Sequence, residues 1–281
     1  DFIMAVNWKK AEEYIKAGKG KKQPVKYAHN VYSDVTHTAT STMMNEVTVL
    51  DVAELKDICY FIPCPKSPHG CDVDPTGEYI VGSGKLAALI PVFSFDKMQK
   101  AIADKNFAGD YDGIPVIKYE AALHGEVQKP GLGPLHTEFD GKGNAYTTFF
   151  VSSEVVKWNI KDLKVIDRAP TYYSVGHLCV PGGDSKKPNA KYVIAYNKIT
   201  KDRYLPTGPE LAQSAQLFDI SGDKMQLILD FPTIGEPHYA QAVPAEVIKD
   251  KSVKIFKIEE NANPYAAKGE KDARVVRKGN R

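Results

Sequence analysis

The sequence predicts an all-β fold of the β-propeller class, and three observations carry this prediction. Short runs rich in β-forming residues recur along the chain, and each reaches Asp or Asn near its end. Two segments repeat a strand, an Asp-x-x-Gly turn and a second strand, which is the pattern of a hairpin with glycine in its turn. Long amphipathic helices are few, and the hairpins recur at irregular intervals of about 40 to 65 residues, as expected for propeller blades with insertions.

The elements follow in chain order. The recurring β-rich runs span 47–52, 91–96, 155–160 and 216–220, and the two hairpins span 71–81 and 138–147. Apolar spacing predicts helical insertions over 8–16 and 95–103. Residues 181–188 form a polar loop that joins two strands after His177. Because the chain turns polar from 261, we expect a partial propeller over 1–260 and a linker over 261–281.

Size and charge narrow the function classes. A chain of 281 residues can bury a full core as one domain. The 37 Lys and Arg nearly balance the 35 Asp and Glu, so the net charge of +2 supports neither a nucleic-acid partner nor an acidic membrane surface. No apolar run approaches the roughly 18 residues that a membrane span needs. The first residues read as the middle of a folded element rather than a signal peptide, and export stays open.

The four cysteines have no metal-ribbon or redox spacing. Buried free thiols are the favoured state, and a disulfide between Cys64 and Cys71 remains open for an oxidising compartment. The cysteines are Cys59, Cys64, Cys71 and Cys179.

Four of the seven histidines occur in similar contexts, beside a turn next to a strand-like run. A turn at a strand edge holds an imidazole in the way that metal binding requires. They are separated by 67, 41 and 61 residues, too far apart for a zinc finger or a helical two-histidine motif. A propeller brings equivalent positions of successive blades together near its axis, so one shared site is expected. The four are His69, His136, His177 and His238.

A set of neutral imidazoles with few carboxylate partners favours a transition metal, copper above all, while zinc remains open. His29, His37 and His124 lack the shared context and are interpreted as surface residues or residues behind the ligands. Two other functions stay open. One is a non-catalytic propeller that binds a single metal ion or none, and the other is a calcium-dependent propeller hydrolase with Asp34 among its axial acids.

Several motifs resemble signatures of the nitrous-oxide reductases. They lie at 65–70, 131–137, 140–148 and 201–205, and the resemblance is strongest from about Pro65 to Val243. The resemblance implies a seven-bladed propeller, a periplasmic location and reduction of N₂O at a four-copper sulfide cluster. In that family seven histidines hold the cluster, and the four histidines above match the last four.

The resemblance also implies roles for further residues. Lys198 matches the family lysine beside the open edge of the cluster, and Glu236 matches its acidic partner. Asp1 and Ser67 match part of one calcium site, and the Lys198 carbonyl and Gln213 match another. Ser67 and Gln213 are neutral oxygen donors where the family usually has Asn and Glu.

The family context implies partners. Its members are head-to-tail homodimers in which a binuclear copper centre, in a separate cupredoxin domain, receives electrons from a small protein such as a c-type cytochrome or a cupredoxin. The Cys-x-x-x-Cys-x-x-x-His motif of that domain and the three upstream histidines have no counterpart in this chain. We therefore expect this segment alone to be inactive.

Overall fold

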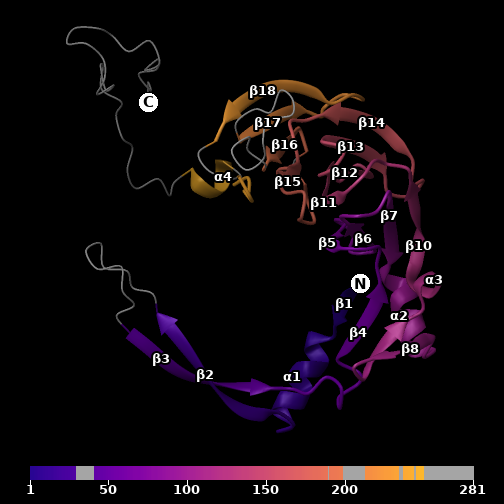
Figure 1. Ribbon diagram of the computed structural model, residues 1–281, viewed down its shortest axis with the longest axis vertical. Coiled ribbons are helices and arrows are strands. Elements are labelled where there is room, and N and C mark those ends of the chain that lie inside the picture. The colour runs from indigo at the N-terminus through magenta and orange to yellow at the C-terminus, as the bar shows by residue number, and fades with distance from the viewer. Residues whose placement is uncertain (30–40, 189, 199–212, 234–236, 244, 250–281) are drawn as a thin grey trace. The chain divides into compact units, whose positions relative to one another are not determined.

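The computed structural model describes residues 1–29, 41–188, 190–198, 213–233, 237–243 and 245–249. Within them the chain forms four four-stranded sheets and one separate hairpin, with a few short helices (Figure 1). This confirms the predicted all-β class with helical insertions. No helix in these ranges is long and apolar enough to cross a membrane.

Three of the sheets are antiparallel meanders, in which the first strand lies at one edge and the last strand at the other. The second sheet contains β5 (Pro68–Val73), β6 (Tyr79–Gly84), β7 (Leu89–Ser94) and β10 (Leu123–Gln128). The third contains β11 (Pro134–Phe139), β12 (Asn144–Phe149), β13 (Glu154–Asn159) and β14 (Val165–Pro170). The fourth contains β15 (Val175–Cys179), β16 (Tyr192–Asn197), β17 (Ser214–Asp219) and β18 (Gln226–Pro232).

The first sheet is built from three separate parts of the chain. Its order is β1-β4-β9-β8, with β4 and β9 parallel and the other pairs antiparallel. The strands are β1 (Phe2–Val6), β4 (Cys59–Pro63), β8 (Phe107–Tyr111) and β9 (Ile114–Ile117). The insertion between β7 and β10, which also carries α2 (Phe95–Ala103) and α3 (Tyr119–Ala122), therefore completes the neighbouring sheet.

The two predicted hairpins are confirmed, and their turns follow one design. Asp74 accepts hydrogen bonds from the backbone of Thr76 (3.2 Å) and Tyr79 (2.8 Å), and Gly77 takes a φ of 81° that disfavours other residues. Asp140 does the same in the β11–β12 turn, where it accepts from Lys142 N at 2.7 Å. The Asp-x-x-Gly pattern thus closes both hairpins by local chemistry.

Three of the four predicted β-rich runs hold equivalent positions. The runs at 91–96, 155–160 and 216–220 fall largely in β7, β13 and β17, each the third strand of its sheet. The run at 47–52 differs, because its first three residues end β3 (Ser41–Val49), which pairs only with β2 (Lys21–His29). Strand propensity alone could not separate this hairpin from a blade.

Both predicted helices are confirmed. Helix α1 (Trp8–Lys16) begins after Asn7, whose side chain accepts from Lys10 N at 3.1 Å. Helix α2 begins after Ser94, which caps Lys97 N at 3.1 Å. Side-chain caps of this kind satisfy backbone donors that the first helical turn leaves open.

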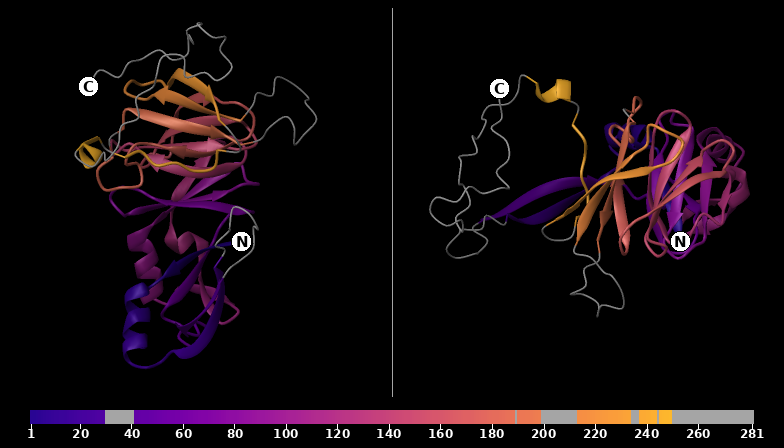
Figure 2. Two further views of the ribbon diagram at one scale, coloured as in Figure 1. Left: turned by 90° about the vertical axis from the view of Figure 1, so that its left-hand side faces the viewer. Right: turned by 90° about the horizontal axis from the view of Figure 1, so that it is seen from above.

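Each pair of successive sheets shares a buried apolar cluster. The cluster between the second and third sheets includes Val92, Phe149 and Trp158, each 0% exposed, and the Trp158 Nε1–H donates to Thr147 Oγ1 at 2.9 Å. Comparable clusters join the first sheet to the second and the third to the fourth. Packing therefore fixes the sheets in chain order (Figure 2).

The chain divides into two compact units, Asp1–Ala242 and Val243–Arg281. Of the second unit the structure describes residues 243 and 245–249, which include α4 (Ala245–Ile248). The predicted boundary after residue 260 lies outside the described residues and stays a prediction.

All four cysteines are free thiols, so the disulfide between Cys64 and Cys71 is not formed. Cys59, Cys64 and Cys179 are buried as expected. Cys71 is exposed, contrary to the expectation, because it lies on β5, the edge strand of the second sheet.

Candidate metal centre

Three of the four predicted histidines lie in a β-bulge in the first strand of their sheet. On β5, Pro68 pairs with Gly84 and Cys71 with Gly82, so three steps on β5 face two on β6, and His69 lies in the extra length. The same shift occurs between Pro134 and Thr137 around His136, and between Val175 and Leu178 around His177. A bulge re-aims a side chain that a regular strand would point to one face.

The first strands of neighbouring sheets lie close together, which gathers these bulges. A Cβ added to Gly70 would lie 2.0 Å from Leu135 O, so only glycine permits this approach of β5 to β11. Thr137 N donates to Asp72 Oδ2 at 2.7 Å across the same boundary. Strand β15 is likewise bonded to β12 of the third sheet, because Thr148 Oγ1 donates to Gly176 O.

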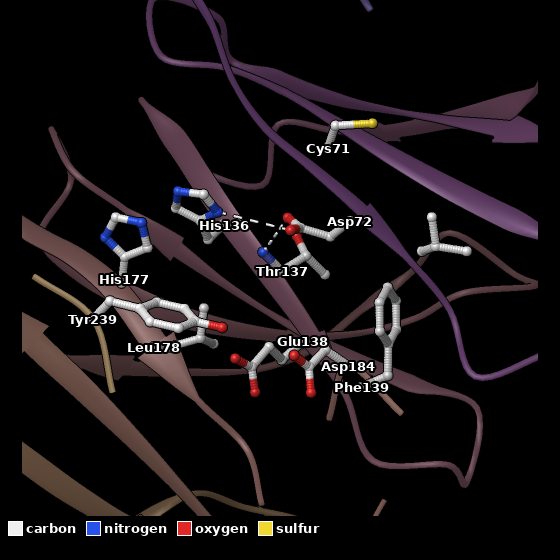
Figure 3. Close-up of a pocket in the computed structure, with 11 residues that line it drawn as sticks. Cys71, Asp72, His136, Thr137, Glu138, Phe139, His177, Leu178, Asp184 and Tyr239 are labelled. Atoms are coloured by element: carbon white, nitrogen blue, oxygen red, sulfur yellow. Dashed lines mark hydrogen bonds and ion pairs between the residues drawn. The ribbon is translucent and has the colours of Figure 1, made fainter. Parts of the chain in front are cut away.

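The four imidazoles form one continuous cluster. The ring centroids are 4.8 Å apart for His69 and His136, 4.0 Å for His136 and His177, and 4.5 Å for His177 and His238. Figure 3 shows His136 and His177 side by side, with Tyr239 next to His177. His238 reaches the cluster from the segment after β18, outside any described strand. The predicted convergence of the four histidines is what the structure shows.

Two of these imidazoles are neutral at ordinary pH. Burial, and after it the neighbouring His136, lowers the pKa of His69 to about 4 and that of His177 to about 3. The charge of Lys198 contributes to both shifts in the same direction. Neutral imidazole is the form that binds a metal ion, so these two histidines keep a lone pair available.

The donor atoms fit a transition metal in one respect. His136 Nε2 and His177 Nδ1 are buried and have no hydrogen-bond partner, which is costly unless another ligand satisfies them. In the described part of the chain, however, no three His, Cys, Asp or Glu side chains surround one ion position. The rings of His136 and His177 are stacked at 23°, so they would have to turn apart to share a metal.

Lys198 follows β16 and is 6% exposed. Its methylene chain crosses Gly176, where an added Cβ would lie 2.0 Å from Lys198 Cε and 2.3 Å from Cδ. The missing side chain at position 176 therefore makes room for a lysine beside His177. The structure thus places the predicted lysine at the histidine cluster.

Sequence reasoning missed Asp72 and Tyr239. Asp72 Oδ1 lies 3.7 Å from His136 Nδ1, and the Tyr239 ring meets His177 edge-on at 5.7 Å (Figure 3). Both line a cavity of about 210 Å³ beside the histidines, together with Glu138 and Asp184. The sequence did offer a signal for Asp72, because it lies three residues after His69 and histidines that bind metals often have a carboxylate partner.

Comparisons with known proteins point to one family. A family model described as the nitrous oxide reductase propeller repeat matches residues 168–238. The chain is 37% identical over 203 residues to the nitrous-oxide reductase of Stutzerimonas stutzeri, which covers 69% of this chain and 30% of that protein. The chain is a partial-length relative of the nitrous-oxide reductases.

Two further nitrous-oxide reductases show the extent of the match. The one from Cupriavidus necator is 36% identical over 230 residues, covering 78% of this chain and 33% of the relative. The one from Ralstonia nicotianae is 33% identical over 295 residues, covering 99% and 41%. The chain spans about a third of the length of these nitrous-oxide reductases.

The residues predicted from the nitrous-oxide reductase resemblance have different outcomes. Glu236 lies outside the described residues, so its pairing with Lys198 stays a prediction. Gln213 Nε2 donates to Lys198 O at 3.4 Å, which brings one predicted calcium pair together. For Asp1 and Ser67 the backbone carbonyls accept from Cys64 N and Lys85 N, and the predicted calcium role of these two residues stays a prediction.

The three remaining histidines also differ. His124 lies on β10, the far edge strand of the second sheet, where its Nε2 is 3.3 Å from Lys161 O. His37 falls outside the described residues, and for His29 only the backbone is described.

Proposed function

We propose that this chain is the propeller portion of an enzyme that reduces N₂O, with two protons and two electrons, to N₂ and water. The observation that carries the proposal is the cluster of four imidazoles at the motif-matched positions, two of them with buried, unpartnered nitrogens. The relation to nitrous-oxide reductases supports the reaction class. The alternative reading as a calcium-dependent hydrolase rests on Asp34, which lies outside the described residues.

His69, His136, His177 and His238 would hold part of a four-copper sulfide cluster. Bound copper would supply the electrons and a Lewis acid for the substrate oxygen. Burial keeps His69 and His177 neutral by lowering the pKa of each imidazole. Lys198 would stabilise developing negative charge on oxygen or deliver a proton, with Glu236 as its acidic partner.

Calcium, the remaining family cofactor, has weaker support. Lys198 O and the Gln213 side chain are adjacent, and their oxygens are hard donors suited to Ca²⁺. Here the amide nitrogen of Gln213 faces the carbonyl, so the side chain would have to turn its oxygen inward. The predicted pair of Asp1 and Ser67 rests on the motif match alone.

The proposal includes the partners of the family. Electrons would come through a binuclear copper centre in a cupredoxin domain of the second subunit of a homodimer, supplied by a c-type cytochrome or a cupredoxin. The location would be periplasmic. We also expect residues 1–281 alone to show no N₂O reduction, because only four of seven cluster histidines are matched; an assay with a reduced viologen dye checks this.

The test compares His136→Ala with His124→Ala in the full-length protein. Copper and acid-labile sulfide are measured per chain, and N₂O reduction is assayed with a reduced viologen. We expect His136→Ala to lose copper, sulfide and activity together, and His124→Ala to keep all three, because His124 lies on an outer strand.

A non-catalytic metal-binding propeller is the second candidate. The stacking of His136 on His177 and the lack of a three-residue ion site within the described ranges favour it. Wild-type protein with a single copper or zinc ion per chain and no sulfide would support this alternative and exclude the cluster.

A further inference from the structure

Asp72 makes two contacts across the boundary between the second and third sheets. Its Oδ2 accepts the backbone N–H of Thr137 at 2.7 Å, and its Oδ1 lies 3.7 Å from His136 Nδ1 (Figure 3). The carboxylate is therefore held from one side by a hydrogen bond while its other oxygen faces the imidazole. Asp72 and His136 are 23% and 21% exposed, so water screens their interaction only in part.

The second ring nitrogen of His136 has a different environment. His136 Nε2 is buried and has no hydrogen-bond partner. A neutral imidazole carries one N–H, and the group facing one nitrogen decides which nitrogen keeps it. At 3.7 Å the carboxylate acts mainly through its charge, which attracts an N–H at Nδ1 and repels a lone pair there. The lone pair then lies on Nε2, the nitrogen that faces no protein donor.

The two other carboxylates at the cavity do not have this relation to a histidine. Glu138 accepts a hydrogen bond from Val180 N, and burial, with a further contribution from the charge of Asp184, raises the Glu138 pKa. Asp184 is exposed and lines the same cavity of about 210 Å³. Asp184 therefore provides a carboxylate of the same charge in the same cavity, without an imidazole opposite.

We infer that Asp72 is a positioning residue for His136: it selects the tautomer with the proton on Nδ1 and so presents the Nε2 lone pair to copper. This inference rests on the proposed function, because it assigns a role toward the proposed copper ligand. It explains why a carboxylate is placed beside a histidine whose opposite nitrogen is left without a partner. Carboxylate, imidazole and metal in line is a recurrent way to orient a ligand.

Two substitutions of Asp72 separate orientation from structure. Asp72→Asn keeps an oxygen for the short bond to Thr137 N and turns its NH₂ toward His136 Nδ1, which favours the opposite tautomer. Asp72→Ala removes both contacts. We expect both variants of the full-length protein to bind copper about 10- to 100-fold more weakly than wild type. Only Asp72→Ala should also lower the thermal unfolding midpoint, because it alone loses the tie between strands.

Asp184→Asn is the matched control, since it makes the same charge change in the same cavity. Copper affinity is measured by competition with a chromophoric copper(I) chelator, together with copper per chain and the visible absorption of the loaded protein. We expect Asp184→Asn to match wild type in all three. A 10-fold or larger loss in Asp72→Asn beside an unchanged Asp184→Asn supports the inference.

The contrary outcomes are distinct. Wild-type affinity and absorption in Asp72→Asn would overturn the inference and leave Asp72 a structural tie. An equal loss in Asp184→Asn would also overturn it, since cavity charge would then be the cause. Wild type without copper, or copper retained by His136→Ala, would instead contradict the proposed function and remove the basis of the inference with it.

Discussion

At the scale of single residues, Gly176 has its effect through what it lacks. The Lys198 methylene chain runs across its Cα, where a Cβ would lie 2.0 Å from Lys198 Cε and 2.7 Å from Cγ. A glycine inside a buried strand weakens the strand, so its presence needs a reason. The reason here is the passage of a cationic side chain to the histidine cluster.

Gly176→Ala is therefore expected to act like the loss of the lysine. The new methyl group would displace Lys198, and N₂O reduction should fall by about 10²-fold, as for a lost proton donor. The rate of N₂O reduction should fall by the same factor in Lys198→Ala. The variant that carries both substitutions should be no slower than Lys198→Ala alone. Steady-state kinetics measure this, with copper per chain as a check that the metal site persists.

Gly82→Ala serves as its control, because its methyl group would press on Ile3 at 2.8 Å rather than on a charged group. It should lower stability and leave activity per copper unchanged. Additive losses from Gly176→Ala and Lys198→Ala would contradict the explanation.

Glu138 provides a second test at this scale. Burial, against the hydrogen bond from Val180 N, raises its pKa from 4.5 to about 8. The native state therefore holds a proton that the unfolded chain releases between these two values. The stability that this carboxyl contributes is full below its unfolded pKa and is lost as pH rises through about 8.

Glu138→Gln should therefore gain stability relative to wild type as pH rises. The glutamine oxygen can still accept from Val180 N, while no proton is lost. Urea unfolding at about pH 5 and about pH 8, with the metal content held fixed, measures the difference. A difference that stays constant or shrinks with pH would show that Glu138 is ionised in the native protein.

At the scale of elements, the bulged first strands combine two tasks. Each bulge turns a histidine toward the cluster, and the same strand contacts a neighbouring sheet. On β5 both depend on Gly70, whose missing side chain permits the approach of Leu135 O. Geometry at this boundary therefore controls the metal site and the packing together.

Gly70→Ala and Gly77→Ala should both lower stability, but only Gly70→Ala should weaken copper binding. Gly70→Ala would force β5 from β11, with a loss of about 1–3 kcal/mol in unfolding free energy and weaker copper binding. Gly77→Ala meets no atom within 4 Å but would strain a turn at φ 81°, with a loss of about 1–2 kcal/mol and unchanged copper binding. Urea unfolding and copper content of both variants are the measurements, and equal copper content would refute the role of the close approach.

At the scale of the whole molecule, the sheets are joined by apolar clusters and by the histidine cluster. His69, His136 and His177 come from three different sheets, so a metal bound by them would link those sheets. Ligands that bind only the native state stabilise it by mass action. The cluster is thus expected to contribute to the stability of the propeller as well as to catalysis.

Copper loading of full-length protein should raise the thermal unfolding midpoint. At free copper 100 times the dissociation constant the gain is about 2.7 kcal/mol. His136→Ala should lose most of this increment, and His124→Ala should keep it. Calorimetry of the metal-depleted and reloaded forms measures the effect, and an increment that survives in His136→Ala would place the metal elsewhere.

Local sequence chemistry was enough for the hairpins, both capped helices and the identity of the clustered histidines. The turn and cap interactions join residues that are only a few positions apart, so the sequence alone predicts them. They are those of Asp74 with Gly77, Asn7 with Lys10 and Ser94 with Lys97. The histidines could be selected because a repeated fold repeats their context.

Only the tertiary structure decided three features: the separate β2–β3 hairpin, the exposure of Cys71, and the contacts of Asp72, Gly70 and Gly176. Asp72 and Thr137 are 65 residues apart, and their bond exists because packing places β5 beside β11. By itself the sequence determined the pattern of strands and turns and which four histidines belong together. Tertiary structure decided how those histidines are aimed, because contacts between sheets depend on packing that no local pattern encodes.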